Sequence, residues 1–148
     1  VLEKIPHCDV FISAAAISDY RPTNKLTEKH KSSDGELVIR LERGEDILKL
    51  AKETKSSLYA VGFSAETNNV SDNAKIKLEK KNIDMIISNE ANHQKGLGFE
   101  SDMNEVCIIE KDSIMKVPRN TKKIIADIIL SRIAKNIRGN LVKIKNAR

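Results

Sequence analysis

The sequence predicts an α/β fold of three layers, in which a mainly parallel sheet carries helices on both faces. Short apolar runs typical of buried strands occur at 10–14, 58–63 and 84–88. Segments with apolar residues at helical spacing alternate with these runs, at 45–55 and 69–81. Because parallel neighbours need a crossover connection, this alternation indicates a parallel sheet covered by helices.

Two later stretches also have strand patterns. Residues 36–41 alternate charged and apolar side chains, as a half-buried strand does. Residues 105–110 and 113–117 are separated by Lys111 and Asp112, and this spacing predicts a β-hairpin. We therefore expect a C-terminal hairpin, followed by one more helix.

The last helix is expected over 120–136, where five isoleucines fall on one stripe, and Gly139 is its expected stop. Residues from about 140 to 148 are expected to form a frayed basic tail. The stretch 18–35, after the first strand, is polar. Most of it, from about 20 to 35, is expected to be a mobile flap.

Length and composition favour one globular domain or part of one, since 32% of the 148 residues are charged and 40% are hydrophobic. The formal net charge of +5 and the pI of about 9.2 predict anionic partners. Aromatic residues make up 3%, which disfavours a base-stacking surface for single-stranded nucleic acid. No apolar run approaches the ~20 residues of a membrane helix, and Cys8 and Cys107 lack metal-ligand spacing. A cytoplasmic location is expected.

Small or polar residues follow each predicted buried strand. In open α/β sheets ligands bind at the carboxyl ends of the strands, so we expect the site at this edge. Ser13, Ala14 and Ala15 would admit a ligand close to the backbone, although alanines also pack well under a helix. Asp19 could accept hydrogen bonds from a ribose or an amine, or hold a metal with the help of water, and an aspartate in a turn is the alternative.

Basic and aromatic residues accompany these strand ends. Lys29 suits closure over a polyphosphate, or is one charge of a solvated loop. Phe63 suits stacking on a base, or belongs to the core. Lys77 and Lys81 lie four residues apart on a predicted helix, where like charges repel by ~0.2–0.5 kcal/mol. An anion between them would remove that repulsion, and a solvated lysine face is the alternative.

Five stretches, taken in order, resemble a single family. They are "DVFISAAAISDYRP", "EKHKS", "VGFSAETNN", "AKIKLEKKNIDMIISN" and "GFESDMNEV". Their order and spacing resemble those of bacterial phosphopantothenoylcysteine synthetase, the phosphopantothenate–cysteine ligase of coenzyme A biosynthesis. The resemblance extends from about Cys8 to the last helix, and it implies that the three-layer fold is Rossmann-like.

The resemblance implies a ligation that consumes CTP in the presence of Mg²⁺. CTP activates the carboxylate of 4′-phosphopantothenate as an acyl-cytidylate, and pyrophosphate leaves. The amine of cysteine then attacks, which gives the amide and CMP. Negative charge builds up as pyrophosphate leaves, and positioned lysines and Mg²⁺ stabilise it.

The resemblance also carries individual residues into a nucleotide site. The matching positions are Ser13, Ala14, Ala15, Asp19, Lys29, Asp46, Ile47, Phe63, Lys77 and Lys81. Lys29 matches the first lysine of the family's flap motif, so a catalytic role beside the triphosphate is implied for it. Metal ligands stay unassigned, and no flavin site is implied.

Partners follow from the same resemblance. It implies a homodimer formed through the sheets, with a contribution from the hairpin at 105–117. In many bacteria a flavin-dependent decarboxylase is fused to this domain. No membrane and no nucleic acid are expected among the partners.

Two departures from the family limit this expectation. Ser32 replaces the last lysine of the flap motif Lys-x-Lys-Lys. The family's first half, which supplies a glycine-rich turn and an asparagine acting on the acyl-cytidylate, has no counterpart in this sequence from Val1 onward. We therefore expect a partial domain that holds the nucleotide side, binds CTP weakly by itself and does not complete the ligation.

Two other interpretations stay open. The chain could be a different Rossmann-like nucleotide-binding domain, which a comparison of CTP with ATP, NAD and GTP would reveal. It could also be a basic module for nucleic acid, which would bind with a steep dependence on salt.

Overall fold

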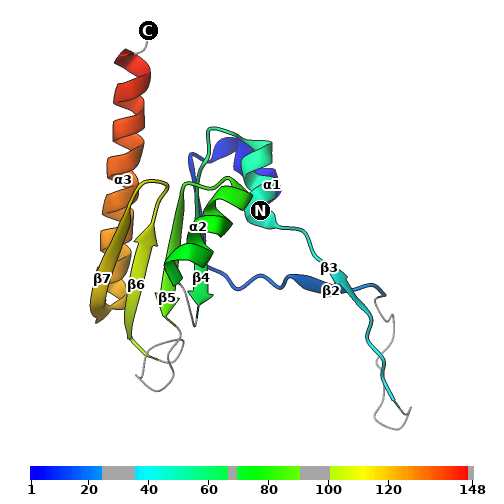
Figure 1. Cartoon of the computed structure of the whole chain (residues 1–148). Helices are drawn as coiled ribbons and strands as arrows, with labels where there is room; N and C mark the ends of the chain where they lie inside the picture. The colour runs from blue at the N-terminus through cyan, green and yellow to red at the C-terminus, as the bar shows by residue number, and fades with distance from the viewer. Residues whose placement is uncertain (25–35, 67–69, 91–100, 147–148) are drawn as a thin grey trace.

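The computed structural model describes residues 1–24, 36–66, 70–90 and 101–146 (Figure 1). Five strands form one sheet in the order β1-β4-β5-β6-β7, and β2 pairs with β3 in a separate two-stranded sheet. The strands are β1 Val10–Ser13, β2 Tyr20–Pro22, β3 Leu41–Arg43, β4 Tyr59–Glu66, β5 Met85–Glu90, β6 Met103–Ile109 and β7 Ile114–Thr121. The helices are the 3-10 helix η1 Leu2–His7 and the α-helices α1 Ile47–Thr54, α2 Val70–Lys81 and α3 Lys122–Asn146.

The predicted three-layer α/β fold is confirmed. β1 pairs with β4, and β4 with β5, in parallel, while β6 and β7 add two antiparallel strands to the same sheet. The expected hairpin is thus an extension of the main sheet. α1 precedes β4 and α2 joins β4 to β5, as the alternating pattern predicted.

Two hydrophobic clusters cover the two faces of this sheet. Alternation along β4 divides them, because Ala60 belongs to the cluster beneath η1, α1 and α2, whereas Tyr59 and Val61 belong to the cluster beneath α3. Leu48 and Leu78 bring α1 and α2 into the first cluster. The second cluster takes the isoleucines of α3, namely Ile125, Ile129 and Ile133.

Polar contacts also fix α3 to the sheet. Arg132 donates from Nη2 to Glu110 Oε2 at 2.6 Å and from Nε to Oε1 at 3.1 Å. Ser113 donates its hydroxyl to Glu110 Oε2 at 2.6 Å. Asn136 Nδ2 donates to the Tyr59 hydroxyl at 2.8 Å and also to Glu110. The helix is therefore held by a hydrogen-bonded cluster beside its apolar stripe.

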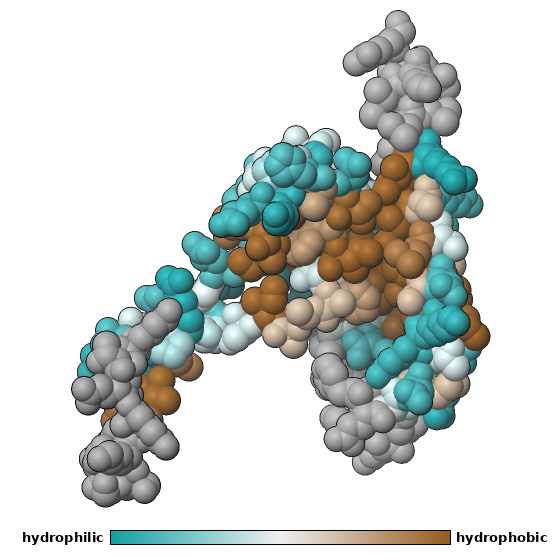
Figure 2. All heavy atoms as spheres, turned by 180° about the vertical axis from the view of Figure 1, so that it is seen from behind, coloured by the Kyte–Doolittle hydropathy of each residue, from teal (hydrophilic) through white to brown (hydrophobic). Residues whose placement is uncertain are grey.

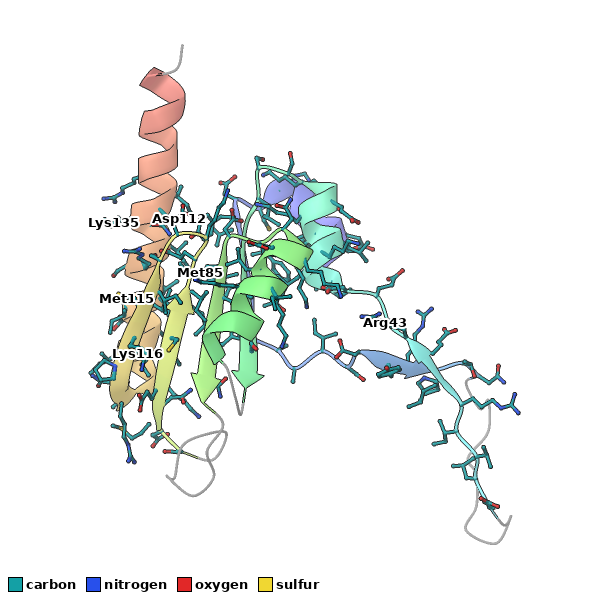
Figure 3. The ribbon with its side chains drawn as sticks, in the orientation of Figure 1. Arg43, Met85, Asp112, Met115, Lys116 and Lys135 are labelled. Atoms are coloured by element: carbon teal, nitrogen blue, oxygen red, sulfur yellow. The ribbon has the colours of Figure 1, made fainter. Side chains whose placement is uncertain are left out.

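The prediction of a half-buried strand at 36–41 is wrong. The structure has only the short β3 there, paired with β2 in an antiparallel arm that extends away from the main sheet (Figure 1). Apolar residues of this arm, among them Val38 and Leu41, are exposed, because no second layer of the described chain covers them. Arg43 projects from the arm, far from Met85 in the body (Figure 3). β2 also lies within the stretch that was predicted to be a polar loop, and residues 25–35 of the expected flap lie outside the described residues.

The predicted end of the last helix is also wrong. α3 continues past Gly139 to Asn146 and so includes most of the expected frayed tail. A glycine inside a helix costs only about 1 kcal/mol relative to alanine, and apolar residues recur after it at Leu141, Val142 and Ile144. That cost is too small to end a helix whose apolar pattern continues.

The face of the sheet on the α3 side is only partly covered. Figure 2, seen from behind, shows hydrophobic side chains gathered over its centre. Ile12, which follows Val10 of the α3-side cluster by two residues on β1, is 37% exposed. β1 is therefore an outer strand whose apolar side is open in the described part of the chain.

Candidate functional site

The carboxyl ends of β1, β4 and β5 lie at one edge of the sheet, because these strands are parallel. In register, Ser13 is opposite Gly62, and Ser64 is opposite Ser88. The expectation that the first two strand ends meet is therefore confirmed. The third predicted loop falls largely on residues 91–100, outside the described residues.

The N-terminus of α1 lies beside the end of α2. Asp46 caps the helix, since its Oδ1 accepts a hydrogen bond from the backbone N–H of Lys49 at 3.2 Å. Its Oδ2 lies 3.0 Å from Lys81 Nζ, which joins the start of α1 to the end of α2. Partial burial opposes ionisation of Asp46, but the hydrogen bonds from Lys81 and Lys49 outweigh it and lower its pKa.

Lys77 contacts the sheet, whereas Lys81 contacts Asp46. Its Nζ lies 3.4 Å from the hydroxyl of Ser64, near the end of β4. The two predicted lysines of α2 thus contact different elements, Lys77 the strand end and Lys81 the cap of α1. Their ammonium groups border one face of the molecule, between α1, α2 and the strand ends.

Small residues line the sheet beneath this face. Ser13 is 9% exposed, while Ala14 and Ala15 follow β1 on the surface. A Cβ on Gly62 would meet Leu48 Cδ1 at 3.0 Å and Ile83 Cδ1 at 3.3 Å. Because Gly62 has no side chain, α1 can pack closely against this part of the sheet.

Phe63 lies on the other face of the same strand. Side chains alternate along β4, so Phe63 shares the side of Val61, beneath α3, whereas Ser64 faces α2 and Lys77. Phe63 is 42% exposed. The structure brings it to the same strand end as Lys77, but on opposite sides of the sheet.

Asp19 lies at the base of the arm. Its backbone carbonyl accepts a hydrogen bond from the N–H of Gly44 at 2.8 Å, two residues before Asp46. Ile47 is the first residue of α1. The structure thus groups Asp19, Asp46 and Ile47 where the arm joins α1, and the predicted Lys29 lies outside the described residues.

A second basic feature was missed in the sequence. A cavity of about 150 Å³ lies between α1 and the end of α2. Its lining residues are Lys49, Lys52, Glu53, Lys80, Lys81 and Asn82. Lys81 thus contributes both to this cavity and to the pair with Asp46. Helical spacing places these lysines on two predicted helices, but only the packing of α1 beside α2 brings them together.

Ser64 and Ser88 were also missed. Alternation from the apolar residues of β4 and β5 would have placed both on the α2 side of adjacent strands. Within the described residues no group of three or more histidine, cysteine, aspartate or glutamate side chains is arranged to hold a metal ion. None of the described helices combines the length and hydrophobicity needed to cross a membrane.

Parallel strands with helical crossovers, and polar groups collected at the strands' carboxyl ends, define a Rossmann-like α/β domain. Residues 1–137 match the family described as the DNA/pantothenate metabolism flavoprotein C-terminal domain, and the chain belongs to this family.

Curated relatives are similar to most of the chain. The coenzyme A biosynthesis bifunctional protein CoaBC of Bacillus subtilis (strain 168) is 36% identical over 135 residues, which are 90% of this chain and 33% of that protein. A cysteine/cysteine sulfinic acid decarboxylase of an unknown prokaryotic organism is 40% identical over 131 residues, which are 86% of this chain and 36% of that protein. The chain thus spans about a third of the length of these relatives.

Solved structures agree with the family. The C-terminal domain of a coenzyme A biosynthesis bifunctional protein CoaBC has a TM-score of 0.72 at 33% identity, with 93% of this chain and 59% of that chain covered. A Cab2 variant in complex with phosphopantothenate-cysteine has a TM-score of 0.70 at 17% identity, with 94% of this chain and 50% of that chain covered. The second likeness shows the fold alone.

Proposed function

We propose that this chain forms the nucleotide-binding part of a CTP-dependent phosphopantothenate–cysteine ligase in coenzyme A biosynthesis. The observation that carries the proposal is the contact of Lys77 with Ser64 near the carboxyl end of β4, beside the end of the parallel β1 at Ser13. The Asp46–Lys81 pair lies one helical turn further along α2. Membership of the family and the name of the CoaBC relatives support the substrate class.

In this proposal the carboxylate of 4′-phosphopantothenate attacks the α-phosphorus of CTP. Pyrophosphate leaves, and an acyl-cytidylate forms. The amine of cysteine then attacks the acyl carbon, and CMP leaves. The chain's part is to bind the nucleotide and to place positive charge beside its phosphates, where negative charge develops.

The described residues fit this task as a cationic surface. Lys77 and Lys81 reach the strand ends and the cap of α1, and Asp46 keeps Lys81 in place until an anion competes for it. Mg²⁺ usually binds through substrate phosphates and one or two carboxylates, with water completing its shell. Glu66 and Glu90 end β4 and β5 opposite each other, and Asp19 and Asp46 lie where the arm joins α1. A metal held by carboxylates among these would neutralise charge on the phosphates.

The chain covers 59% of the solved CoaBC C-terminal domain. The resemblance assigns the contacts to the acyl substrate to the part that is not matched. We therefore expect the 148-residue chain alone to bind CTP and to form no amide product. A single-turnover assay with CTP, 4′-phosphopantothenate and cysteine tests this, and amide formation would contradict it.

Ligand-induced stabilisation tests the nucleotide itself. A ligand that binds only the folded state raises the unfolding temperature, and at equal concentration the tighter ligand raises it more. We expect CTP with Mg²⁺ to raise the Tm more than ATP, GTP or NAD at equal concentration. Equal shifts for all nucleotides would favour a different Rossmann-like domain, and tight, salt-dependent binding of nucleic acid would favour the basic module.

Matched lysine variants locate the site. Lys77→Met should reduce the CTP-induced shift, because it removes the cation beside Ser64. Lys75 is exposed and lies two residues earlier on α2. Lys75→Met removes an equal charge and should leave the CTP-induced Tm shift unchanged. Equal losses in both variants would indicate general charge attraction instead of a site.

We also propose that the protein is a homodimer that pairs through the hairpin of β6 and β7. β7 is an outer strand of the main sheet, so one of its backbone edges is open to pairing within the described chain. Light scattering of the purified chain gives the mass directly, and a monomer at micromolar concentration would contradict this part.

A further inference from the structure

One buried polar side chain among the described residues lacks a hydrogen-bond partner. Ser88 is 1% exposed, and its hydroxyl makes no hydrogen bond to any part of the described chain. Most buried polar side chains have a partner, because an unmade hydrogen bond in the interior costs free energy. Alanine would fill this position without that cost, so the serine calls for a reason other than stability.

The hydroxyl of Ser88 faces a specific set of neighbours. Ser88 has the same strand parity as Ile86, which lies in the cluster beneath α1 and α2, so its side chain is on the α2 side. In register it is opposite Ser64 on β4 and Cys107 on β6. Ser64 and Ser88 are therefore side by side on neighbouring strands, about 4.8 Å apart.

The same row contains a cation. Lys77 Nζ lies 3.4 Å from the hydroxyl of Ser64. Lys77 is exposed, Ser64 is half-buried and Ser88 is buried, so the row leads from the surface into the sheet. Two hydroxyls on neighbouring strands, with an ammonium beside one of them, are groups that can bind a tetrahedral oxyanion.

We propose that Ser88, Ser64 and Lys77 form a subsite for a phosphate group on the α2 side of β4 and β5. This inference rests on the proposed function, because the phosphate would be that of the bound nucleotide or of the pyrophosphate it releases. When the side chains that cover Ser88 move aside to admit the anion, Ser88 donates to one phosphate oxygen and Ser64 to another, and Lys77 neutralises the charge. Ser64 and Ser88 are thus positioning residues for the reaction, in addition to the lysines.

The test uses the 148-residue chain and three variants: Ser88→Ala, Ser64→Ala and, as control, Ser57→Ala on the exposed turn before β4. The probes are CTP with Mg²⁺, inorganic pyrophosphate and cytidine, with Kd measured by calorimetry. Ser88→Ala should raise the Tm of the free protein and weaken CTP and pyrophosphate about two- to tenfold, the range of one hydrogen bond. Cytidine binding and all properties of Ser57→Ala should stay unchanged.

The outcomes separate the subsite from the proposed function. If the wild-type chain prefers CTP but Ser88→Ala binds CTP and pyrophosphate equally well, the subsite is overturned and the function stands. If Ser88→Ala weakens pyrophosphate but the wild-type chain shows no preference for CTP, the subsite stands and the function fails. Loss of cytidine binding in step with CTP overturns the phosphate assignment, and binding of neither CTP nor pyrophosphate overturns both proposals.

Discussion

Asp46 and Lys81 connect the two helices that cover one face of the sheet, with 3.0 Å between Oδ2 and Nζ. The same carboxylate caps α1 through the N–H of Lys49. Asp46 therefore has a structural role in addition to its place in the proposed nucleotide site. The two roles can be separated, because asparagine caps a helix about as well as aspartate but carries no charge.

Asp46→Ala should lower the free energy of unfolding by about 1 kcal/mol more than Asp46→Asn, because only alanine removes the cap. Asp46→Asn itself should cost less than about 1 kcal/mol, since both partners of the ion pair are about one-third exposed. Urea denaturation measures both values. Glu53→Gln, which removes the exposed partner of Lys49 at 3.8 Å, should change little. Equal losses for alanine and asparagine at Asp46 would contradict the capping role.

Local periodicity made α1, α2 and the parallel core predictable, because the residues that define each element lie close together in the sequence. The arm was not predictable in this way. The alternation at 36–41 is that of a half-buried strand, but the burial of a strand depends on a second layer that local sequence does not specify. The same limit applies to Ser88, whose neighbours on β4 and β6 are distant in the sequence and whose missing hydrogen bond appears only in three dimensions.

The contact between Gly62 and α1 gives a second prediction. Gly62→Ala would bring a methyl group to 3.0 Å from Leu48 Cδ1, so α1 must move or Leu48 must change rotamer. Overpacking of this kind typically costs about 1–3 kcal/mol. Gly139→Ala is the matched control, because nothing lies within 4 Å of its new Cβ and the position is inside α3. That variant should be stabilised by up to about 1 kcal/mol. Thermal unfolding of the pair should therefore show shifts of opposite sign.

The ionisation of Glu110 makes the free energy of unfolding depend on pH. Burial would raise the pKa of Glu110, but hydrogen bonds from Arg132, Ser113 and Asn136 outweigh it and lower the pKa to about 2. Because the folded-state pKa is below the ordinary 4.5, this carboxylate stabilises the fold fully above pH 4.5. The contribution, at most about 3 kcal/mol, is lost as the pH falls from about 4.5 toward 2.

Glu110→Gln should therefore be less stable than the wild type at pH 7, and its stability should decline less between pH 5 and about pH 2. Denaturation curves at several pH values measure this difference. Glu36→Gln, at an exposed position on the arm, should follow the wild-type profile. If Glu110→Gln and the wild type lose stability in parallel on acidification, the cluster around Arg132 does not hold an ionised carboxylate in solution.

Asp84 connects α1 to the start of β4, at the edge of the sheet opposite the carboxyl ends of the strands. Its Oδ2 accepts hydrogen bonds from Lys52 Nζ at 2.7 Å and from the backbone N–H of Ala60 at 2.8 Å. The side chain of Lys52 is 11% exposed and also donates to the Leu58 carbonyl at 2.5 Å. Removal of the carboxylate would leave a largely buried ammonium and a backbone N–H without their acceptor.

Asp84→Ala should lower the free energy of unfolding by about 1–3 kcal/mol, because the largely buried Lys52 ammonium and the Ala60 N–H lose their acceptor. Asp84→Asn should cost less, since its amide oxygen can still accept from Ala60. The double variant Lys52→Met with Asp84→Ala should recover part of the loss, because the unpaired charge is absent. Urea denaturation of the three variants measures these differences as a double-mutant comparison. A loss below about 1 kcal/mol for Asp84→Ala would mean that Lys52 reaches water once its partner is gone, and that the pair does not hold α1 against the sheet.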